Sequence, residues 1–153
     1  MLNSARNQSP LDERQIEFCR IAWELLTGGQ GIPLITDEAQ LYASETRFDE
    51  NRNAVILGAN AYPGVGVSAN AQLSMLTCLA HELAHAERFR MGFRRPFTQP
   101  DMLLDEAETS LHASFFTLEL SETDRIHLVE DARDRLNLYL ELKYAERGSV
   151  YES

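Results

Sequence analysis

The chain has 153 residues, the size of one compact domain, and its 44% apolar and 25% charged residues exclude a largely disordered protein. Its 14 Lys and Arg residues stand against 24 Asp and Glu residues, which gives a net charge of −10, and the one arginine cluster (Arg88, Arg90, Arg94 and Arg95) is short and interrupted. Because nucleic-acid backbones are bound through a basic surface, we expect no DNA or RNA partner.

The cysteines and the distribution of apolar residues bear on the cellular compartment. Cys19 and Cys78 each lie beside apolar neighbours, and no repeated spacing connects them, which favours buried thiols in a reducing compartment. No basic segment followed by an apolar one opens the sequence, and no apolar run approaches about 18 residues. We therefore expect a cytoplasmic protein that is neither secreted nor embedded in a membrane.

The first part of the chain is predicted to combine one helix with three short strands. Residues 1–9 are polar, and we expect a flexible N-terminus followed by one domain over residues 10–150. Apolar residues at helical spacing predict a helix over residues 11–27, which ends at the glycines that follow it. Segments rich in β-branched and aromatic residues, separated by Asp- and Asn-containing turns, predict strands over residues 32–36, 41–48 and 54–57.

The second part of the chain is predicted to be helical. A loop rich in Gly, Pro and Asn over residues 58–70 leads into a helix over residues 71–91. That helix is apolar on most of its circumference and should therefore be buried at the centre of the domain. Two more helices are predicted, over residues 101–120 and from residue 121 to about residue 147. The order of elements indicates an α+β domain in which a small three-stranded sheet packs on about four helices.

The predicted central helix contains the sequence His81-Glu82-Leu83-Ala84-His85. Side chains four positions apart lie one helical turn above one another, so both imidazoles can reach one metal ion. Glu82 lies about 100° around the helix from His81, beside such an ion, where it can serve as a general base toward water. These polar side chains would be unfavourable to bury in an apolar helix without a partner. The motif therefore predicts a Zn²⁺ site, and a satisfied pair of core histidines is the alternative.

Two histidines leave such a site one protein ligand short, because catalytic zinc takes three and keeps the fourth position open. No third histidine follows His85 at short distance, but the next predicted helix offers acidic residues between positions 105 and 108. Glu106 lies on a flank that also carries small residues, which would let two helices approach closely. We expect Glu106 to be the third ligand, and Glu108 and Asp105 stay open as alternatives.

Through these residues the sequence resembles the gluzincin metallopeptidases, and is closest in style to the small ImmA/IrrE-type peptidases and minimal gluzincin domains. The family's later motif would fall on Glu106-Ala107-Glu108-Thr109-Ser110. The resemblance implies a zincin-like fold, His81, His85 and Glu106 as zinc ligands, and Glu82 as the general base. Ser110 stands where the family has an Asp or Asn that orients a histidine, and Thr109 stands where Ala is usual. Because serine is a shorter and weaker partner, a water or another acid is an alternative orienting group.

Two further features of such a peptidase are less well determined by the sequence. The group that would stabilise the transition state has four candidates, each of which is more commonly a packing residue: Tyr62, His112, Tyr139 and Tyr144. The segment over residues 53–58 precedes the predicted central helix, where zincins carry their edge strand, so the resemblance implies an exposed edge there. Such an edge can bind an extended peptide through main-chain hydrogen bonds.

The sequence as a whole predicts a zinc-dependent endopeptidase that hydrolyses peptide bonds of a protein substrate, with Glu82 as the general base. A domain of this length has little wall outside its central elements for deep specificity pockets. We therefore expect narrow specificity that depends on a single target or on a regulatory protein partner, as the resemblance implies. A zinc-stabilised binding module without turnover is the main alternative, and a metal-free helical adaptor is the other.

Overall fold

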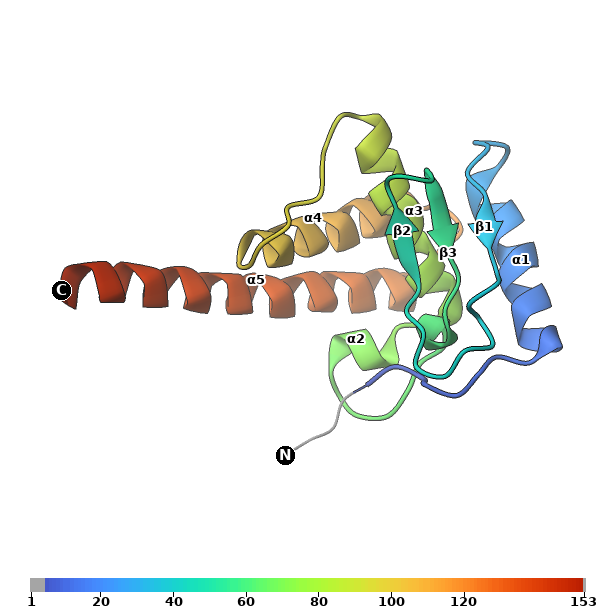
Figure 1. Ribbon diagram of the computed structural model, residues 1–153, viewed down its shortest axis with the longest axis horizontal. Helices are drawn as coiled ribbons and strands as arrows, with labels where there is room; N and C mark the ends of the chain where they lie inside the picture. Colours follow the sequence, from blue (N-terminus) through green and yellow to red (C-terminus); the bar gives the residue numbers. More distant parts are fainter. Residues whose placement is uncertain (1–4, 153) are drawn as a thin grey trace.

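The structure describes residues 5–152, with side chains described through residue 147. These residues form helices and one small sheet, joined by loops (Figure 1). The computed structural model gives the elements in this order: α1 (Glu13–Thr27), β1 (Leu34–Ile35), β2 (Arg47–Asp49), β3 (Ala54–Ile56), the 3₁₀ turn η1 (Ala59–Ala61), α2 (Ala69–Gln72), α3 (Met75–Arg90), α4 (Asp101–Phe116) and α5 (Glu122–Glu152). The predicted α+β class with its small three-stranded sheet is confirmed. None of the described helices combines the length and the apolar character that crossing a membrane requires.

Local side-chain interactions set where the helices begin and end. Asp12 caps α1 by accepting a hydrogen bond from the backbone N–H of Gln15 in a capping box. The predicted helix over residues 71–91 is divided into α2 and α3, because Ser74 is extended and its hydroxyl caps the start of α3. The predicted helix over residues 101–120 is shorter, since α4 gives way to extended backbone at Thr117.

The sheet places β3 at its centre, with the strand order β1-β3-β2. β3 pairs in parallel with β1 and antiparallel with β2, where Val55 lies opposite Phe48. All three residues of β3 are buried, which suits their small and β-branched side chains. The prediction that residues 53–58 form an exposed edge is therefore wrong, and β2 is the edge strand on that side of β3.

The N-terminal segment is tied to the loop in front of α3, where a flexible segment was predicted over residues 1–9. Ala5 forms a β-bridge with Val65. The guanidinium of Arg6 donates hydrogen bonds to backbone carbonyls on both sides of that loop, those of Asn60, Ala61, Asn70 and Leu73. Residues 1–4 of the predicted segment lie outside the described residues.

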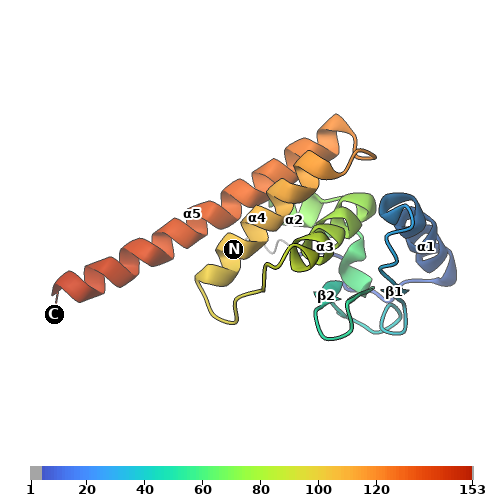
Figure 2. The ribbon, with the colours of Figure 1, turned by 90° about the horizontal axis from the view of Figure 1, so that it is seen from above.

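α3 lies at the centre of the molecule, between α1 and the sheet on one side and the pair formed by α4 and α5 on the other (Figures 1 and 2). α5 runs beside α4 and continues past it, so that the C-terminal part of α5 projects from the body (Figure 1). Small, fully buried residues line the contact between α3 and α4, among them Ala80, Ala84 and Ala113. They bring the backbones of the two helices close together, which positions the site described next.

Candidate metal centre

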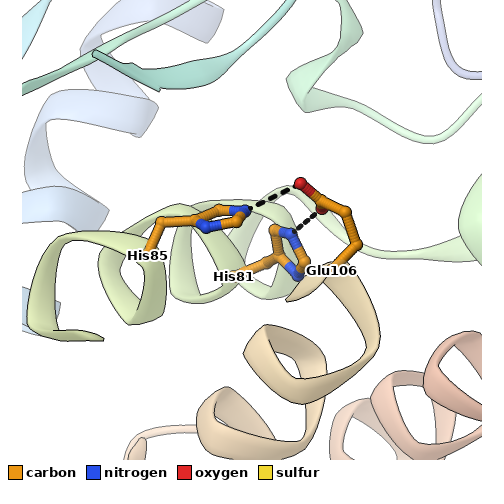
Figure 3. A group of neighbouring side chains, drawn as sticks. All are labelled: His81, His85 and Glu106. Carbon is orange, nitrogen blue, oxygen red and sulfur yellow. Dashed lines mark hydrogen bonds and ion pairs between the residues drawn. The ribbon is translucent and has the colours of Figure 1, made fainter. Parts of the chain in front are cut away.

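His81 and His85 project from neighbouring turns of α3 toward Glu106 on α4 (Figure 3). The Nε2 atom of His81 lies 2.8 Å from one carboxylate oxygen of Glu106, and that of His85 lies 3.1 Å from the other. One ligand atom from each residue falls within a group whose members are all within 4.8 Å of one another. The structure thus brings together the three residues that were predicted as metal ligands.

The chemistry of these three groups fits a divalent metal ion. Two imidazole nitrogens and one carboxylate form a donor set that leaves a fourth position for water or substrate in catalytic zinc sites. All three side chains are largely removed from solvent, since His81, His85 and Glu106 are between 6% and 9% exposed. A metal ion between them would take the place of the two imidazole contacts to the buried Glu106 carboxylate, which also contacts Arg95 and Arg135.

The carboxylate of Glu106 and the imidazole of His81 shift one another's pKa values. Burial alone would raise the pKa of Glu106, but hydrogen bonds from His81 and His85, together with their charges, bring that pKa far below its ordinary value. Burial likewise opposes the charged form of His81, yet its hydrogen bond to Glu106 and the charge of Glu106 outweigh burial and raise the pKa of His81. Protons and metal ions would therefore compete for the space between these groups.

Glu82 lies next to the ligand group but takes no part in it. Its side chain is 8% exposed, and one carboxylate oxygen is buried without a hydrogen-bond partner among the described residues. Burial raises the pKa of Glu82, and the charges of His85 and His81 oppose that rise. Glu82 lines the same cleft as His81 and Glu106. An acceptor that the protein leaves unpaired at this point is available to a water molecule or a substrate.

The outer nitrogen of His81 is held by a relay that reaches a third helix. Nδ1 of His81 lies 2.9 Å from the hydroxyl oxygen of Ser110, and this hydroxyl donates to a carboxylate oxygen of Asp131 at 2.7 Å. Asp131 lies on α5 and is only 2% exposed. The sequence left the partner of this histidine open between Ser110, a water and another acid, and in the structure Ser110 contacts His81 and connects it to an acid that the sequence did not identify, Asp131. Only the long-range packing of α5 on α4 makes Asp131 a candidate.

The outer nitrogen of His85 faces α4 as well. Its Nδ1 lies 3.4 Å from the hydroxyl of Thr109 and 3.9 Å from the carboxylate of Asp105. Asp105 is paired with Arg88 at 3.2 Å, and the exposed Glu108 is paired with the same guanidinium at 2.9 Å. Among the acidic residues at positions 105–108, Glu106 is thus the one that contacts Nε2 of both histidines. The two alternatives, Asp105 and Glu108, form ion pairs with Arg88.

The four candidates for stabilising a transition state do not line the cleft that contains His81, Glu82 and Glu106. The hydroxyl of Tyr62 donates to the carbonyl of Gln15 at 3.2 Å, and His112 lies 3.4 Å from Glu87. The ammonium of Lys143 lies over the ring of Tyr139, 5.8 Å from its centroid, and Tyr144 is 66% exposed. These residues have structural or surface roles in the described part of the chain.

Two arginines that were not predicted as site residues, Arg95 and Arg135, contact the carboxylate of Glu106. Arg95, from the segment between α3 and α4, lies 2.7 Å from one carboxylate oxygen, and Arg135, from α5, lies 3.4 Å from the other. Arg135 is also held by Asp131 at 3.0 Å, four residues earlier on the same helix. That spacing is a signal in the sequence, but a single acid–base pair on a highly charged helix is too common to mark a site.

A cleft of about 360 Å³ opens onto the candidate metal centre on the side of His81 and Glu106. It is lined by His81, Glu82 and Glu106, by both arginines, and by residues 45–47 at the start of β2. Its volume lies at the lower end of the range of small-molecule sites. A short stretch of peptide or a compact ligand could occupy it.

The comparisons with known proteins assign no family to this arrangement. No protein-family model matches the chain, and neither a curated protein nor a solved structure is similar to it. The resemblance to gluzincins therefore depends on the residues between positions 81 and 110, and it stays a prediction.

Proposed function

We propose that the chain is a zinc-dependent peptidase in which His81, His85 and Glu106 hold the metal ion and Glu82 is the general base. The observation that carries this proposal is the unpaired, buried carboxylate oxygen of Glu82 in a cleft that it shares with His81 and Glu106, two members of the His-His-Glu group. A purely structural zinc site has four protein ligands and no need of an additional carboxylate. Three ligands and an adjacent base are the arrangement of hydrolytic zinc sites.

Each residue has a defined task in peptide hydrolysis. Zinc, when bound, supplies a Lewis acid for the peptide carbonyl and lowers the pKa of water toward about 7. Glu82 accepts a proton from the attacking water and returns it to the amine nitrogen as the C–N bond breaks. Ser110 and Asp131 hold His81 through its Nδ1, which keeps its Nε2 directed at the metal position.

The edge of the sheet offers a place for a protein or peptide substrate. β2 pairs with β3 on one side only within the described residues, and residues 45–47 line the cleft. An extended peptide can pair with the other side of such a strand through main-chain hydrogen bonds. The free thiols of Cys19 and Cys78 support a reducing compartment such as the cytoplasm.

The test compares zinc-loaded wild type with Glu82→Gln on a mixture of unstructured peptides, with cleavage followed by mass spectrometry and zinc content measured in parallel. The variant should bind zinc like the wild type and cleave about 10²- to 10⁴-fold more slowly, because only the proton carrier is lost. Glu87→Gln, on the same helix but outside the cleft, is the matched control.

Retained cleavage by Glu82→Gln would reject the role of Glu82, and protein purified without chelators that contains no metal would reject the metal site. Wild type that binds zinc tightly but cleaves none of the peptides would instead favour a zinc-stabilised binding module.

A further inference from the structure

The cleft gathers positive side chains in a chain whose net charge is −10. Four arginines line it (Arg6, Arg47, Arg95 and Arg135), against three glutamates (Glu45, Glu82 and Glu106). A bound divalent metal ion would add two more positive charges. A cleft of this kind draws anions to itself while the acidic remainder of the surface repels them.

Two of these arginines, Arg6 and Arg47, already form hydrogen bonds or ion pairs that stabilise the fold. Arg6 donates to backbone carbonyls at both ends of the loop between η1 and α3. Arg47 forms a two-pronged pair with Glu38, at 3.1 and 3.0 Å. The charge of Arg47 is balanced by Glu38, and the donors of Arg6 are occupied by backbone carbonyls, so both are best understood as parts of the cleft wall.

Arg95 and Arg135 are different, because both share the single carboxylate of Glu106 with two histidines. Arg135 has Asp131 as a second partner. Arg95 has no second acidic partner among the described contacts, and its Nε is buried without a hydrogen bond. A metal ion ligated by Glu106 would draw on the same carboxylate, which leaves Arg95 with unbalanced charge and unused donors.

The backbone around Arg95 fixes its position beside the metal centre. Its own N–H donates to the carboxylate of Glu50 at 2.9 Å, which ties the segment before α4 to the turn between β2 and β3. The side chain remains 37% exposed, so a ligand in the cleft can reach it. A guanidinium held in this way binds a carboxylate through two parallel hydrogen bonds better than any other anion receptor in the standard set of side chains.

We propose that Arg95, supported by Arg135, binds a carboxylate of the substrate next to the metal centre, so that the preferred substrates are peptides with a negative charge near the scissile bond. This inference rests on the proposed peptidase function. The carboxylate has two sources, the free C-terminus of a peptide or an Asp or Glu side chain. The first would make the protein a carboxypeptidase, and the second would make it an endopeptidase that cuts beside acidic residues.

The experiment measures kcat/KM on matched peptides that differ only in charge. One pair carries a free C-terminal carboxylate or a C-terminal amide, and a second, amidated pair carries Glu or Gln beside the scissile bond. Wild type should prefer the charged member of one pair by about 10- to 100-fold, the range for a hydrogen bond to a charged group. In Arg95→Gln this ratio should fall to near one, whereas Arg94→Gln, whose side chain lies over Phe89, should keep it.

Ratios within one protein variant cancel any general effect of Arg95 on Glu106 and on zinc content. The pair that shows the preference identifies the source of the carboxylate. Equal rates on both members of both pairs in wild type, or a preference that survives in Arg95→Gln, would overturn the inference.

A binding measurement separates this inference from the peptidase proposal. Zinc-loaded Glu82→Gln is titrated calorimetrically with the same peptides, so no turnover is needed. Charged peptides that bind at least 10-fold more tightly than neutral ones would support carboxylate recognition even if wild type cleaves nothing. Equal affinities in this titration would reject it whether or not wild type is a peptidase.

Discussion

The two sides of α3 differ in how polar their interiors are, although the α4–α5 side also has a smaller apolar cluster that includes Ala80, Ala84 and Leu128. Toward α1 and the sheet, Leu79 and Leu83 of α3 belong to an apolar core that includes Trp23, Leu26 and Val55. Toward α4 and α5, the same helix presents histidines to the buried Glu106, Ser110 and Asp131 and to the half-buried Arg135. One helix therefore carries both the main apolar core and the candidate site.

This difference shows that the two sides obtain their stability in different ways. Apolar burial stabilises the α1 side by roughly 25 cal/mol per Å² and requires no ligand. Buried charges on the α4–α5 side lose their hydration, and mutual pairing recovers only part of that free energy. We therefore expect a bound metal ion to stabilise the protein through the α4–α5 side alone. A cycle that combines each substitution with zinc addition tests this expectation directly.

The largest effect concerns zinc itself. At free zinc 1,000-fold above its dissociation constant, the free energy of unfolding should rise by about 4 kcal/mol. His81→Ala should abolish this increment, because it removes a ligand, and denaturant unfolding with zinc or with a chelator measures it. His112→Ala, which changes a histidine paired with Glu87 outside the site, should retain the increment. An undiminished increment in His81→Ala would mean that zinc stabilises the protein elsewhere.

The apolar side should respond to substitution without regard to zinc. Leu26 of α1 is 5% exposed within the apolar core, and Leu26→Ala should lower the free energy of unfolding by about 2–5 kcal/mol. The loss should be the same with zinc and with chelator, because Leu26 shares no partner with the metal ligands. A zinc increment that shrinks in this variant would show that the two sides are coupled through α3, against the separation argued above.

The sequence predicted those features that depend on local spacing. His81 and His85 share a helix face because they are four residues apart, and Glu106 was favoured because small residues on its flank allow a close helix–helix contact. The class of the fold followed from helical periodicity and short β-rich segments. Each of these depends on neighbours within a few turns of chain.

Features that depend on contacts between distant segments escaped prediction. β3 was expected at an edge because the family resemblance implied it. Nothing in residues 54–56 themselves shows which strands will pair with them, and the structure places β3 between β1 and β2. The roles of Asp131 and Arg95 arise only when α5 and the segment before α4 reach the site. Arg6 likewise is one arginine in a polar segment until the loop before α3 surrounds it with carbonyls.

Asp131 gives the smallest of the expected effects and the sharpest test of the polar side. Its carboxylate accepts from the hydroxyl of Ser110, which in turn contacts Nδ1 of His81. Asp131→Asn keeps the shape but removes the charge that makes the imidazole a better ligand, and such outer changes weaken metal affinity by about 10- to 100-fold. Competition with a zinc chelator of known affinity measures the change, and Asp134→Asn, exposed on the same helix, should leave affinity unchanged.

The hydrogen bonds that connect Asp131 to His81 through Ser110 lead to one more prediction, for the double variant. If its influence passes through Ser110, then Ser110→Ala interrupts the relay, and adding Asp131→Asn to Ser110→Ala should weaken zinc affinity little further. Independent contributions would instead multiply in the double variant. If the two losses of zinc affinity multiply, Asp131 acts on the metal centre by a second route. That route runs through Arg135, which contacts both Asp131 and Glu106.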